Sequence, residues 1–375
     1  MGCCYSARMK SENPSCNVVN VTHDSKQEDG LIGGSNKVSQ LKIFKYDELK
    51  TATRIFHPHN MVGEGGSGKV FKGWLDEQTL APAKPGTGIA IAVKKLNQDA
   101  FQGHKESLVK TEINVQGQLH HPNIVKLLGC CLEDDHRLLV HEFLTKRSLE
   151  YHLSPRISHV EPLSWSNRKK IALDAAKALA FLHSDEVNVI YRDLKASHIL
   201  LDSNFNAKLS DSCLAKDGSL DDESHCWATG THIYAAPEYT ATGRLIKKCD
   251  VYSFGVVLLE ILSGKRAFDR SRLAGEQNLV AWAKQYFPSK CWFFQVMDAR
   301  IKGQYLVHEA MKVAKIAIQC LSDKPQFRPT MADVVGALEL VQDSSDTGSS
   351  SRSNDSVPKQ HQRSTNESLN EAGTY

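Results

Sequence analysis

A glycine-rich segment near residue 65 has the composition of a phosphate-binding loop. Its pattern is Gly-x-Gly-x-x-Gly-x-Val, formed by Gly63, Glu64, Gly65, Gly66, Ser67, Gly68, Lys69 and Val70. Glycine lacks a Cβ atom, so the backbone amides of such a loop can come close to phosphate oxygens. Because an ordinary surface turn can have the same pattern, the surrounding residues must decide.

Two well-known nucleotide-binding loops are excluded by this context. A P-loop requires Ser or Thr directly after its Gly-Lys pair to bind Mg²⁺, and Val70 occupies that position. Both the P-loop and the dinucleotide-binding fingerprint also continue into a helix. Residues 70–74, which include Phe71, instead have the residue types of a strand. The sequence therefore predicts a glycine-rich hairpin that covers phosphates.

Charged residues further along the chain could complete a phosphate-handling site. Lys94 ends a short apolar, strand-like run, and Glu112 lies in a helix-like stretch from which it could pair with that lysine. Asp193, Lys195 and Asp211 follow much later. Each residue alone is as common on a surface or in a core as in a site. Only a fold that brings them together could use them.

The hydrophobicity pattern predicts two structural halves. Of the 375 residues, 41% are hydrophobic and 24% are charged, which is enough apolar material for a folded core. Short β-branched runs occupy residues 89–93 and 137–141, whereas residues 168–183 have helical periodicity and residues 251–262 are almost continuously apolar. A sheet-rich part followed by a helix-rich part predicts an α+β fold with two lobes.

Charge and cysteine usage narrow the class of protein. The 46 Lys and Arg residues nearly balance the 43 Asp and Glu residues, so the net charge is only +3 and no nucleic-acid partner is expected. The ten cysteines lack metal-ligand spacing, which favours reduced thiols. The sequence has neither an apolar run of about 18 residues nor a secretory signal. These features predict a soluble protein that faces the cytosol.

The ordered motifs together make the chain resemble the eukaryotic protein kinases over roughly residues 56–341. Besides the glycine-rich segment and Lys94, the motifs are Tyr191-Arg192-Asp193-Leu194-Lys195, Asp211-Ser212-Cys213, Ala236-Pro237-Glu238 and Asp250-Val251-Tyr252-Ser253-Phe254-Gly255. Gly86-Thr87-Gly88-Ile89 and the Met-Gly-Cys-Cys start are similar to plant receptor-like cytoplasmic kinases. The resemblance implies the two-lobed kinase fold, with a β-rich N-lobe carrying one helix, αC, and a helical C-lobe.

We expect the following domain boundaries. Residues 1–43 form a flexible, lipid-anchored tail, and residues 44–341 form the kinase domain. Within this domain the N-lobe covers about 56–140, the hinge 141–145 and the C-lobe 146–341. Residues 342–375 are rich in serine and are expected to be disordered.

The resemblance also implies a role for each charged residue. Lys94 would neutralise the α- and β-phosphates of ATP and would be oriented by Glu112. Asp193 would accept the proton of the substrate hydroxyl, and Lys195 would steady the transferred phosphoryl group. Asp211 would hold the Mg²⁺ ion that bridges the β- and γ-phosphates.

Further residues match the family's nucleotide and substrate positions. Val70, Ala92 and Leu200 match positions that sandwich adenine, and His141, the first residue of the predicted hinge, occupies the gatekeeper position. Lys195 and Thr231 stand where Ser/Thr-directed kinases have them, so Ser/Thr substrates are expected. Glu238 and Arg328 are expected to form a structural ion pair.

One departure from the family pattern affects metal binding. The second metal ligand is normally an asparagine, and His198 replaces it. Mg²⁺ is a hard ion that prefers oxygen ligands, so His198 would be a poor ligand for it. A borderline ion such as Mn²⁺ would suffer less.

Other departures affect an apolar column that normally contains the phenylalanine of Asp-Phe-Gly. Ser212 replaces that phenylalanine and Cys213 the glycine, while Gln116 and Tyr191 occupy neighbouring positions of the column. Losing a buried aromatic contact costs about 3–5 kcal/mol in a core. Two interpretations stay open at this point: a Ser/Thr kinase, because the charged residues are present, or a pseudokinase that serves as a scaffold or decoy.

The segment between Asp211 and the Ala-Pro-Glu motif offers candidate phosphorylation sites. The candidate hydroxyl side chains are Ser219, Ser224, Thr229 and Thr231. Thr231 is better interpreted as a substrate-pocket residue than as a switch. Arg192 is present, so a phosphate on this segment could dock on a basic group.

The amino terminus matches a lipidation signal. Met-Gly-x-x-x-Ser is the pattern for myristoylation of Gly2, and Cys3 and Cys4 are candidate palmitoylation sites. One myristoyl chain binds a bilayer only marginally, so a second lipid is needed. The expected location is the cytoplasmic face of the plasma membrane. The resemblance implies receptor-like kinases and protein substrates as partners, in receptor-proximal signalling such as plant immune signalling.

Overall fold

The structure is a computed structural model, which describes residues 41–65, 68–97, 113, 115–153, 161–210, 214–216, 231–287 and 292–346.

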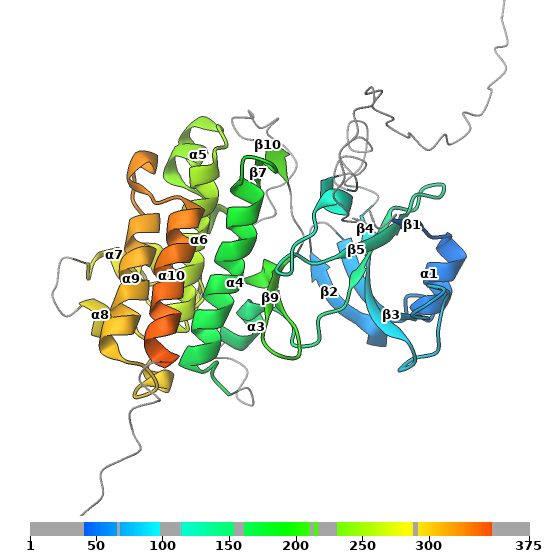
Figure 1. Ribbon diagram of the computed structural model, residues 1–375, viewed down its shortest axis with the longest axis horizontal. Helices are drawn as coiled ribbons and strands as arrows, with labels where there is room; N and C mark the ends of the chain where they lie inside the picture. Colours follow the sequence, from blue (N-terminus) through cyan, green and yellow to red (C-terminus); the bar gives the residue numbers. More distant parts are fainter. Residues whose placement is uncertain are drawn as a thin grey trace, which may run out of the picture. The chain divides into compact units, whose positions relative to one another are not determined.

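A six-stranded sheet occupies the N-terminal half of the described chain (Figure 1). The strands are β1 (Lys42–Ile43), β2 (Met61–Gly65), β3 (Gly68–Leu75), β4 (Ile89–Leu96), β5 (Leu127–Cys131) and β6 (Leu138–Glu142). Their order is β1-β5-β6-β4-β3-β2, and all neighbours are antiparallel except β1, which runs parallel to β5. A helix, α1 (Tyr46–Ala52), follows β1. This sheet positions the glycine-rich segment and Lys94.

The glycine-rich segment is the hairpin that the sequence predicts. Strands β2 and β3 pair antiparallel, with Gly65 opposite Gly68. Gly68 has a φ of +142°, and a Cβ atom on it would lie 2.1 Å from the carbonyl oxygen of Lys95. No other residue type fits there. The chain continues from this hairpin into a strand, which confirms the exclusion of the P-loop and the dinucleotide fingerprint.

Helices dominate the second half of the described chain. They are α3 (Leu149–Leu153), α4 (Trp165–His183), α5 (Pro237–Thr242), α6 (Lys247–Ser263), α7 (Leu279–Lys284), α8 (Trp292–Val296), α9 (Val307–Cys320) and α10 (Met331–Asp346). The four longest, α4, α6, α9 and α10, lie side by side in Figure 1. Helix α6 is buried on all sides, which explains its nearly continuous apolar sequence.

Helix α4 shows why the local sequence folds in this way. Ser164 caps the helix, because its hydroxyl accepts a hydrogen bond from the backbone N–H of Asn167 at 3.2 Å. Ile171, Leu179 and Leu182 then recur on one face and are buried. The helix therefore starts at Trp165, three residues before the predicted periodic stretch.

Short elements connect the longer helices and strands. They are η1 (Pro58–Asn60), β7 (Val189–Ile190), η3 (Ala196–His198), β8 (Ile199–Leu201), β9 (Ala207–Leu209), β10 (Ala215–Lys216), η4 (Thr231–Ile233), η5 (Ala299–Ile301) and η6 (Pro325–Phe327). Strand β7 pairs with β10, and β8 pairs with β9. Residues 191–195 lie between β7, which pairs with β10, and η3, which leads into β8 and its partner β9.

The predicted α+β fold with a sheet-rich N-lobe and a helical C-lobe is confirmed. The folded part differs from the expected boundaries at both ends, because β1 lies within residues 1–43 and α10 continues to Asp346. The reason at the N-terminal end is that β1 hydrogen-bonds to β5 and leads into the buried Phe44. We propose residues 41–346 as the folded unit.

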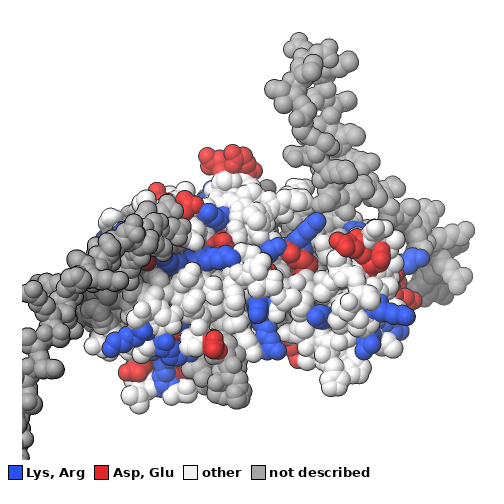
Figure 2. All heavy atoms as spheres, turned by 60° about the horizontal axis from the view of Figure 1, so that its bottom comes forward, with Lys and Arg blue, Asp and Glu red and all other residues white. Residues whose placement is uncertain are grey.

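The described surface carries charges of both signs. On the face drawn in Figure 2, basic and acidic side chains are interspersed among neutral ones. None of the described helices is both long enough and apolar enough to cross a membrane.

Candidate active site

Asp250 on α6 anchors the catalytic motif. Its two carboxylate oxygens accept hydrogen bonds from the backbone N–H groups of Tyr191, at 2.7 Å, and Arg192, at 2.8 Å. The ring Nε2 of His183 lies 2.8 Å from the same carboxylate. Asp250 is only 1% exposed, so these donors replace water around its charge. They also hold Arg192 in the left-handed region, at a φ of +75°.

Asp193 presents one carboxylate oxygen to Lys195 and keeps the other available. The ammonium group of Lys195 donates to Oδ2 at 2.9 Å. Asp193 Oδ1 is buried and has no hydrogen-bond partner among the described residues. Buried polar atoms are normally paired, and unpaired ones often mark a place where a ligand binds. A hydroxyl group at Oδ1 could donate its proton there.

His198 takes part in the same loop through its ring. Nδ1 lies 2.9 Å from the backbone carbonyl oxygen of Asp193, and a carbonyl only accepts, so Nδ1 carries the proton. The backbone carbonyl of His198 accepts hydrogen bonds from the N–H of Ser210, at 2.9 Å, and from its hydroxyl, at 3.1 Å. His198 therefore joins the catalytic loop to the segment that leads to Asp211.

His198, at the position of the second metal ligand, is poorly suited to bind Mg²⁺. Within the described ranges no group of three His, Cys, Asp or Glu side chains could hold a metal ion. The protonated Nδ1 of His198 cannot coordinate a metal, which leaves only Nε2, a nitrogen that Mg²⁺ disfavours. The role of His198 in metal binding stays a prediction that concerns Nε2 alone.

Polar contacts occur where the family pattern has an apolar column. The buried Tyr191 donates from its hydroxyl to the carbonyl oxygen of Ser210, directly before Asp211. On the sheet side, Nε2 of His141 on β6 lies 3.3 Å from Oε1 of Gln116. Two of the unusual residues thus have polar partners, and the cost expected from losing apolar contacts is partly offset by these hydrogen bonds.

Lys94 lies in the central part of the sheet. It is on β4, between Val70 of β3 and Leu139 of β6 in the strand register, and is 7% exposed. A lysine is almost never buried to this extent unless it is paired. Ala92 lies two residues earlier on β4 and pairs with His141. Val70, Ala92 and Leu200 are half-buried, as residues that line an adenine site would be.

Glu142, in the predicted hinge, connects the two lobes through an ion pair. Glu142 accepts from Lys208 of β9 with both carboxylate oxygens, each at 2.8 Å. It also accepts from the backbone N–H of Lys126 at 2.8 Å. These contacts fix the start of the predicted hinge, 141–145, against the C-lobe.

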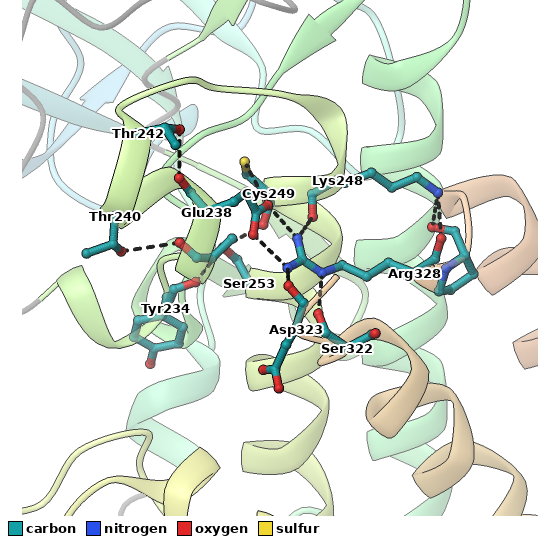
Figure 3. Close-up of polar contacts among 12 residues, drawn as sticks. Tyr234, Glu238, Thr240, Thr242, Lys248, Cys249, Ser253, Ser322, Asp323 and Arg328 are labelled. Atoms are coloured by element: carbon teal, nitrogen blue, oxygen red, sulfur yellow. Dashed lines mark hydrogen bonds and ion pairs between the residues drawn. The ribbon is translucent and has the colours of Figure 1, made fainter. Parts of the chain in front are cut away.

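The predicted ion pair between Glu238 and Arg328 is confirmed (Figure 3). The two groups meet through two parallel hydrogen bonds, at 2.6 and 2.7 Å. Arg328 also donates to the carbonyl oxygens of Lys248, at 2.9 Å, and Ser322, at 2.8 Å. The thiol of Cys249 lies 3.6 Å from Glu238. This network joins α5, which carries Glu238, to the connection between α9 and α10.

Sequence reasoning did not assign a role to Glu260. This residue is buried on α6, where its carboxylate accepts from the hydroxyl of Tyr234 at 3.0 Å and from the N–H of Ala267 at 2.8 Å. Burial raises the pKa of Glu260 to about 8. The available signal was a charged residue inside the otherwise apolar run of residues 256–262.

Several predicted site residues lie outside the described residues. They are Gly2, Cys3, Cys4, Gly66, Ser67, Glu112, Asp211, Ser212, Cys213, Ser219, Ser224 and Thr229, and for Thr231 only the backbone, in η4, is described. The structure thus brings Asp193, Lys195 and His198 together. The Lys94–Glu112 pair and the metal ligand Asp211 stay predictions.

Comparisons with known proteins identify the family. The sequence profile of the protein tyrosine and serine/threonine kinases matches residues 56–338. Receptor-like cytoplasmic kinase 176 of Oryza sativa subsp. japonica is 52% identical, with 93% of this chain and 92% of the relative covered. Serine/threonine-protein kinase BIK1 of Arabidopsis thaliana is 54% identical over 92% and 90% of the two chains, and the probable serine/threonine-protein kinase PBL10 of the same plant is 52% identical over 93% and 88%. The chain therefore belongs to the protein kinase family and is similar over most of its length to plant receptor-like cytoplasmic kinases.

Proposed function

We propose that this protein is an ATP-dependent protein serine/threonine kinase, anchored by lipids at the cytoplasmic face of the plasma membrane, that acts in receptor-proximal signalling. The observation that carries the proposal is the state of Asp193: one oxygen bound by Lys195 and the other buried without a described partner. That arrangement suits a base that waits for a substrate hydroxyl.

Asp193, Lys195 and Lys94 would handle the proton and the phosphoryl group during transfer. Asp193 Oδ1 would accept the hydrogen bond of a serine or threonine hydroxyl and then its proton. The hydroxyl oxygen would bond to the γ-phosphorus of ATP while the bond from that phosphorus to the β–γ bridging oxygen breaks and ADP leaves. Lys195 would offset the negative charge on the transferred group, since its ammonium is already beside Asp193. Lys94 would bind the α- and β-phosphates from the sheet side. When bound with ATP, Mg²⁺ would neutralise phosphate charge, and Asp211 is the residue predicted to hold it.

Specificity for serine and threonine is supported by Lys195 and Thr231, which occupy the positions expected of such kinases. The relatives from Arabidopsis thaliana named above carry serine/threonine-protein kinase in their names.

Transfer of radiolabelled phosphate from ATP tests the proposal. The full chain, an Asp193→Asn variant and an Asp185→Asn variant would be assayed for autophosphorylation and for labelling of a basic protein substrate. Asp185 is an exposed aspartate, so its variant controls for the loss of one charge. We expect the parent and D185N to label equally and D193N to fall by at least about 100-fold. Equal labelling by all three proteins would contradict the proposed kinase activity.

A pseudokinase is the second candidate function, and it is favoured by the replacement of a metal ligand by His198 and of apolar contact residues by Ser212 and Gln116. Running the assay with Mg²⁺ and with Mn²⁺ separates the two candidates. A slow kinase gives a signal that depends on Asp193, larger with Mn²⁺. A pseudokinase gives no signal with either ion. A higher melting temperature with ATP would then show a pseudokinase that binds ATP, and an unchanged one would show a pseudokinase that does not.

Membrane anchoring requires its own test, since Gly2, Cys3 and Cys4 lie outside the described residues. Two lipid signals together give stable anchoring, whereas one gives only weak binding. We expect Gly2→Ala to move the protein from the membrane fraction to the soluble fraction, and Cys3→Ser with Cys4→Ser to do so in part. Unchanged partitioning of G2A would contradict the anchor.

A further inference from the structure

Residues 41–55 precede the region that the family profile matches, yet they fold as part of the N-lobe. Strand β1 pairs with β5, and the N–H of Phe44 donates to the carbonyl oxygen of Cys130 at 2.8 Å. Phe44, Leu49 and Ala52 are buried in one cluster with core residues of the sheet. We call residues 41–55 the flank. Its apolar residues complete a core that the sheet alone would leave open.

The sheet has a glycine where the flank comes closest. A Cβ atom on Gly129 of β5 would lie 2.0 Å from the carbonyl oxygen of Lys42 and 2.7 Å from the ring of Phe44. Real side chains do not make such contacts with backbone atoms, so any larger residue would displace β1. Gly129 is therefore adapted to the presence of the flank.

The first residue of the flank contacts the αC helix. Residues 113 and 115–118 are helical and form what we call the αC end. A Cβ atom on Gly117 would lie 2.6 Å from Cδ1 of Leu41, so the leucine side chain sits directly over this glycine. Leu41 also packs against a cluster of Leu96, Ile113, Leu127, Cys130 and Leu139. The αC end is thus in contact with the flank and with β4, β5 and β6 at once.

A second contact holds the αC end from the sheet side. Gln116 is 3.3 Å from His141 of β6, and Ile113 is buried in the cluster that contains Leu41. Glu112, the predicted partner of Lys94, directly precedes Ile113 in the chain. Because the two residues are adjacent in the chain, whatever fixes Ile113 also limits where the predicted partner of Lys94 can lie.

We propose that Leu41 is a positioning residue for phosphotransfer: it seats the αC end through Gly117, and the flank is a brace for the helix-like stretch that carries Glu112, the predicted partner of Lys94. The catalytic consequence rests on the proposed function, whereas the seating of αC does not. Chemistry at the site belongs to Asp193, so Leu41 would act on ATP binding and not on proton transfer. The residues 1–40 join the folded unit directly before this contact.

A rescue experiment on the full chain tests the brace. The variants are Leu41→Ala, Gly117→Ala and the double variant. Leu41→Ala removes the side chain that seats αC, and Gly117→Ala pushes against it. Combining them lets the new alanine methyl occupy space that the leucine leaves. Alanine is a better helix former than glycine, so a weaker αC end in G117A could not come from helix propensity.

The measurements are the ATP dissociation constant, the KM for ATP and the kcat, and the hydrogen exchange of residues 113–118. We expect Leu41→Ala to weaken ATP binding by about 2- to 30-fold and to speed exchange at the αC end. Gly117→Ala should do the same to a smaller extent, because the atom that its methyl group meets is the free end of the Leu41 side chain. The kcat at saturating ATP should change less than the KM. The double variant should recover most of the loss in both readouts.

Leu128→Ala is the matched control, because Leu128 is a half-buried leucine on β5 that packs against the other cluster of the sheet. This variant should lower the melting temperature without speeding exchange at the αC end. The proposal is overturned if L41A acts no differently from L128A, or if the losses in L41A and G117A simply add. Should the protein prove not to bind ATP, hydrogen exchange at residues 113–118 still decides the seating of αC, so the two proposals fail separately.

Discussion

Helix α6 holds a buried carboxylate near each of its ends, and the two are surrounded differently. Asp250 receives hydrogen bonds from two backbone N–H groups and from His183, and so fixes the catalytic loop. Glu260 receives one from the neutral hydroxyl of Tyr234 and one from the N–H of Ala267. Burial raises the pKa of Glu260 to about 8. One helix therefore positions both the catalytic loop, through Asp250, and the segment that contains Tyr234, through Glu260. The two carboxylates differ in how completely hydrogen bonds from the protein replace those from water.

The largest expected effect concerns the buried arginine that joins α4 to the Glu260 end of α6. Arg168 is fully buried and donates to the carbonyl oxygen of Ile261 at 2.6 Å and to Asp298 at 2.5 Å. Without Arg168, the buried Asp298 keeps only Arg300 as a cationic partner, and the carbonyl oxygens of Leu163 and Ile261 lose a charged donor. Arg168→Ala should lower the free energy of unfolding by about 3–5 kcal/mol, measured by urea denaturation.

Lys177→Ala on the same helix is the control, because its ion pair with Glu339 is exposed. It should change the free energy of unfolding by no more than about 0.5 kcal/mol. Similar losses for the two variants would show that burial is not what makes the Arg168 pair important.

The next effect tests the Asp250 end. Asp250→Asn keeps the shape of the side chain but removes its charge, and one of its two acceptor oxygens becomes a donor facing a backbone N–H group. We expect kcat to fall by about 100-fold, since a displaced catalytic loop misplaces Asp193. Steady-state phosphorylation of a peptide measures this, with D185N as the control. A D250N protein with the parental kcat would mean that the loop holds its shape without this carboxylate.

The titration of Glu260 should make the free energy of unfolding depend on pH. A carboxyl whose pKa is higher in the folded chain than its ordinary value of 4.5 binds more protons when folded, so stability falls as pH rises from about 4.5 to about 8. Glu260→Gln cannot titrate. The melting temperature of E260Q relative to the parent should therefore increase steadily between pH 5 and pH 8. A difference that is constant with pH would show that Glu260 does not titrate in this range.

The smallest expected effect concerns Tyr191. Its hydroxyl bonds to the carbonyl oxygen of Ser210, so Tyr191→Phe removes one buried hydrogen bond and leaves the ring in place. The loss should be about 1 kcal/mol in stability, and kcat should fall less than fivefold. Tyr305→Phe in the C-lobe serves as the comparison. A large loss of kcat in Y191F alone would place the hydroxyl among the groups that position Asp211.

Residue types and spacing predicted the α+β fold and the glycine-rich hairpin, and the resemblance to the kinase family gave roles to Asp193 and Lys195, which form a pair in the structure. These features are local: the pair is two residues apart in the chain, and the hairpin's glycines are contiguous with the strands that form it. Local features are encoded in short stretches of sequence, where backbone propensity and side-chain chemistry act together.

Only the tertiary structure decided which distant residues support that site. The hydrogen bonds of Asp250 to the catalytic loop, the contact of His141 with Gln116 and the seating of Leu41 over Gly117 join residues that are far apart in sequence. A leucine, a glycine or a glutamine carries no chemical signal of its own. Its effect depends on which surface the folded chain brings against it, and that is set by the packing of all the elements together.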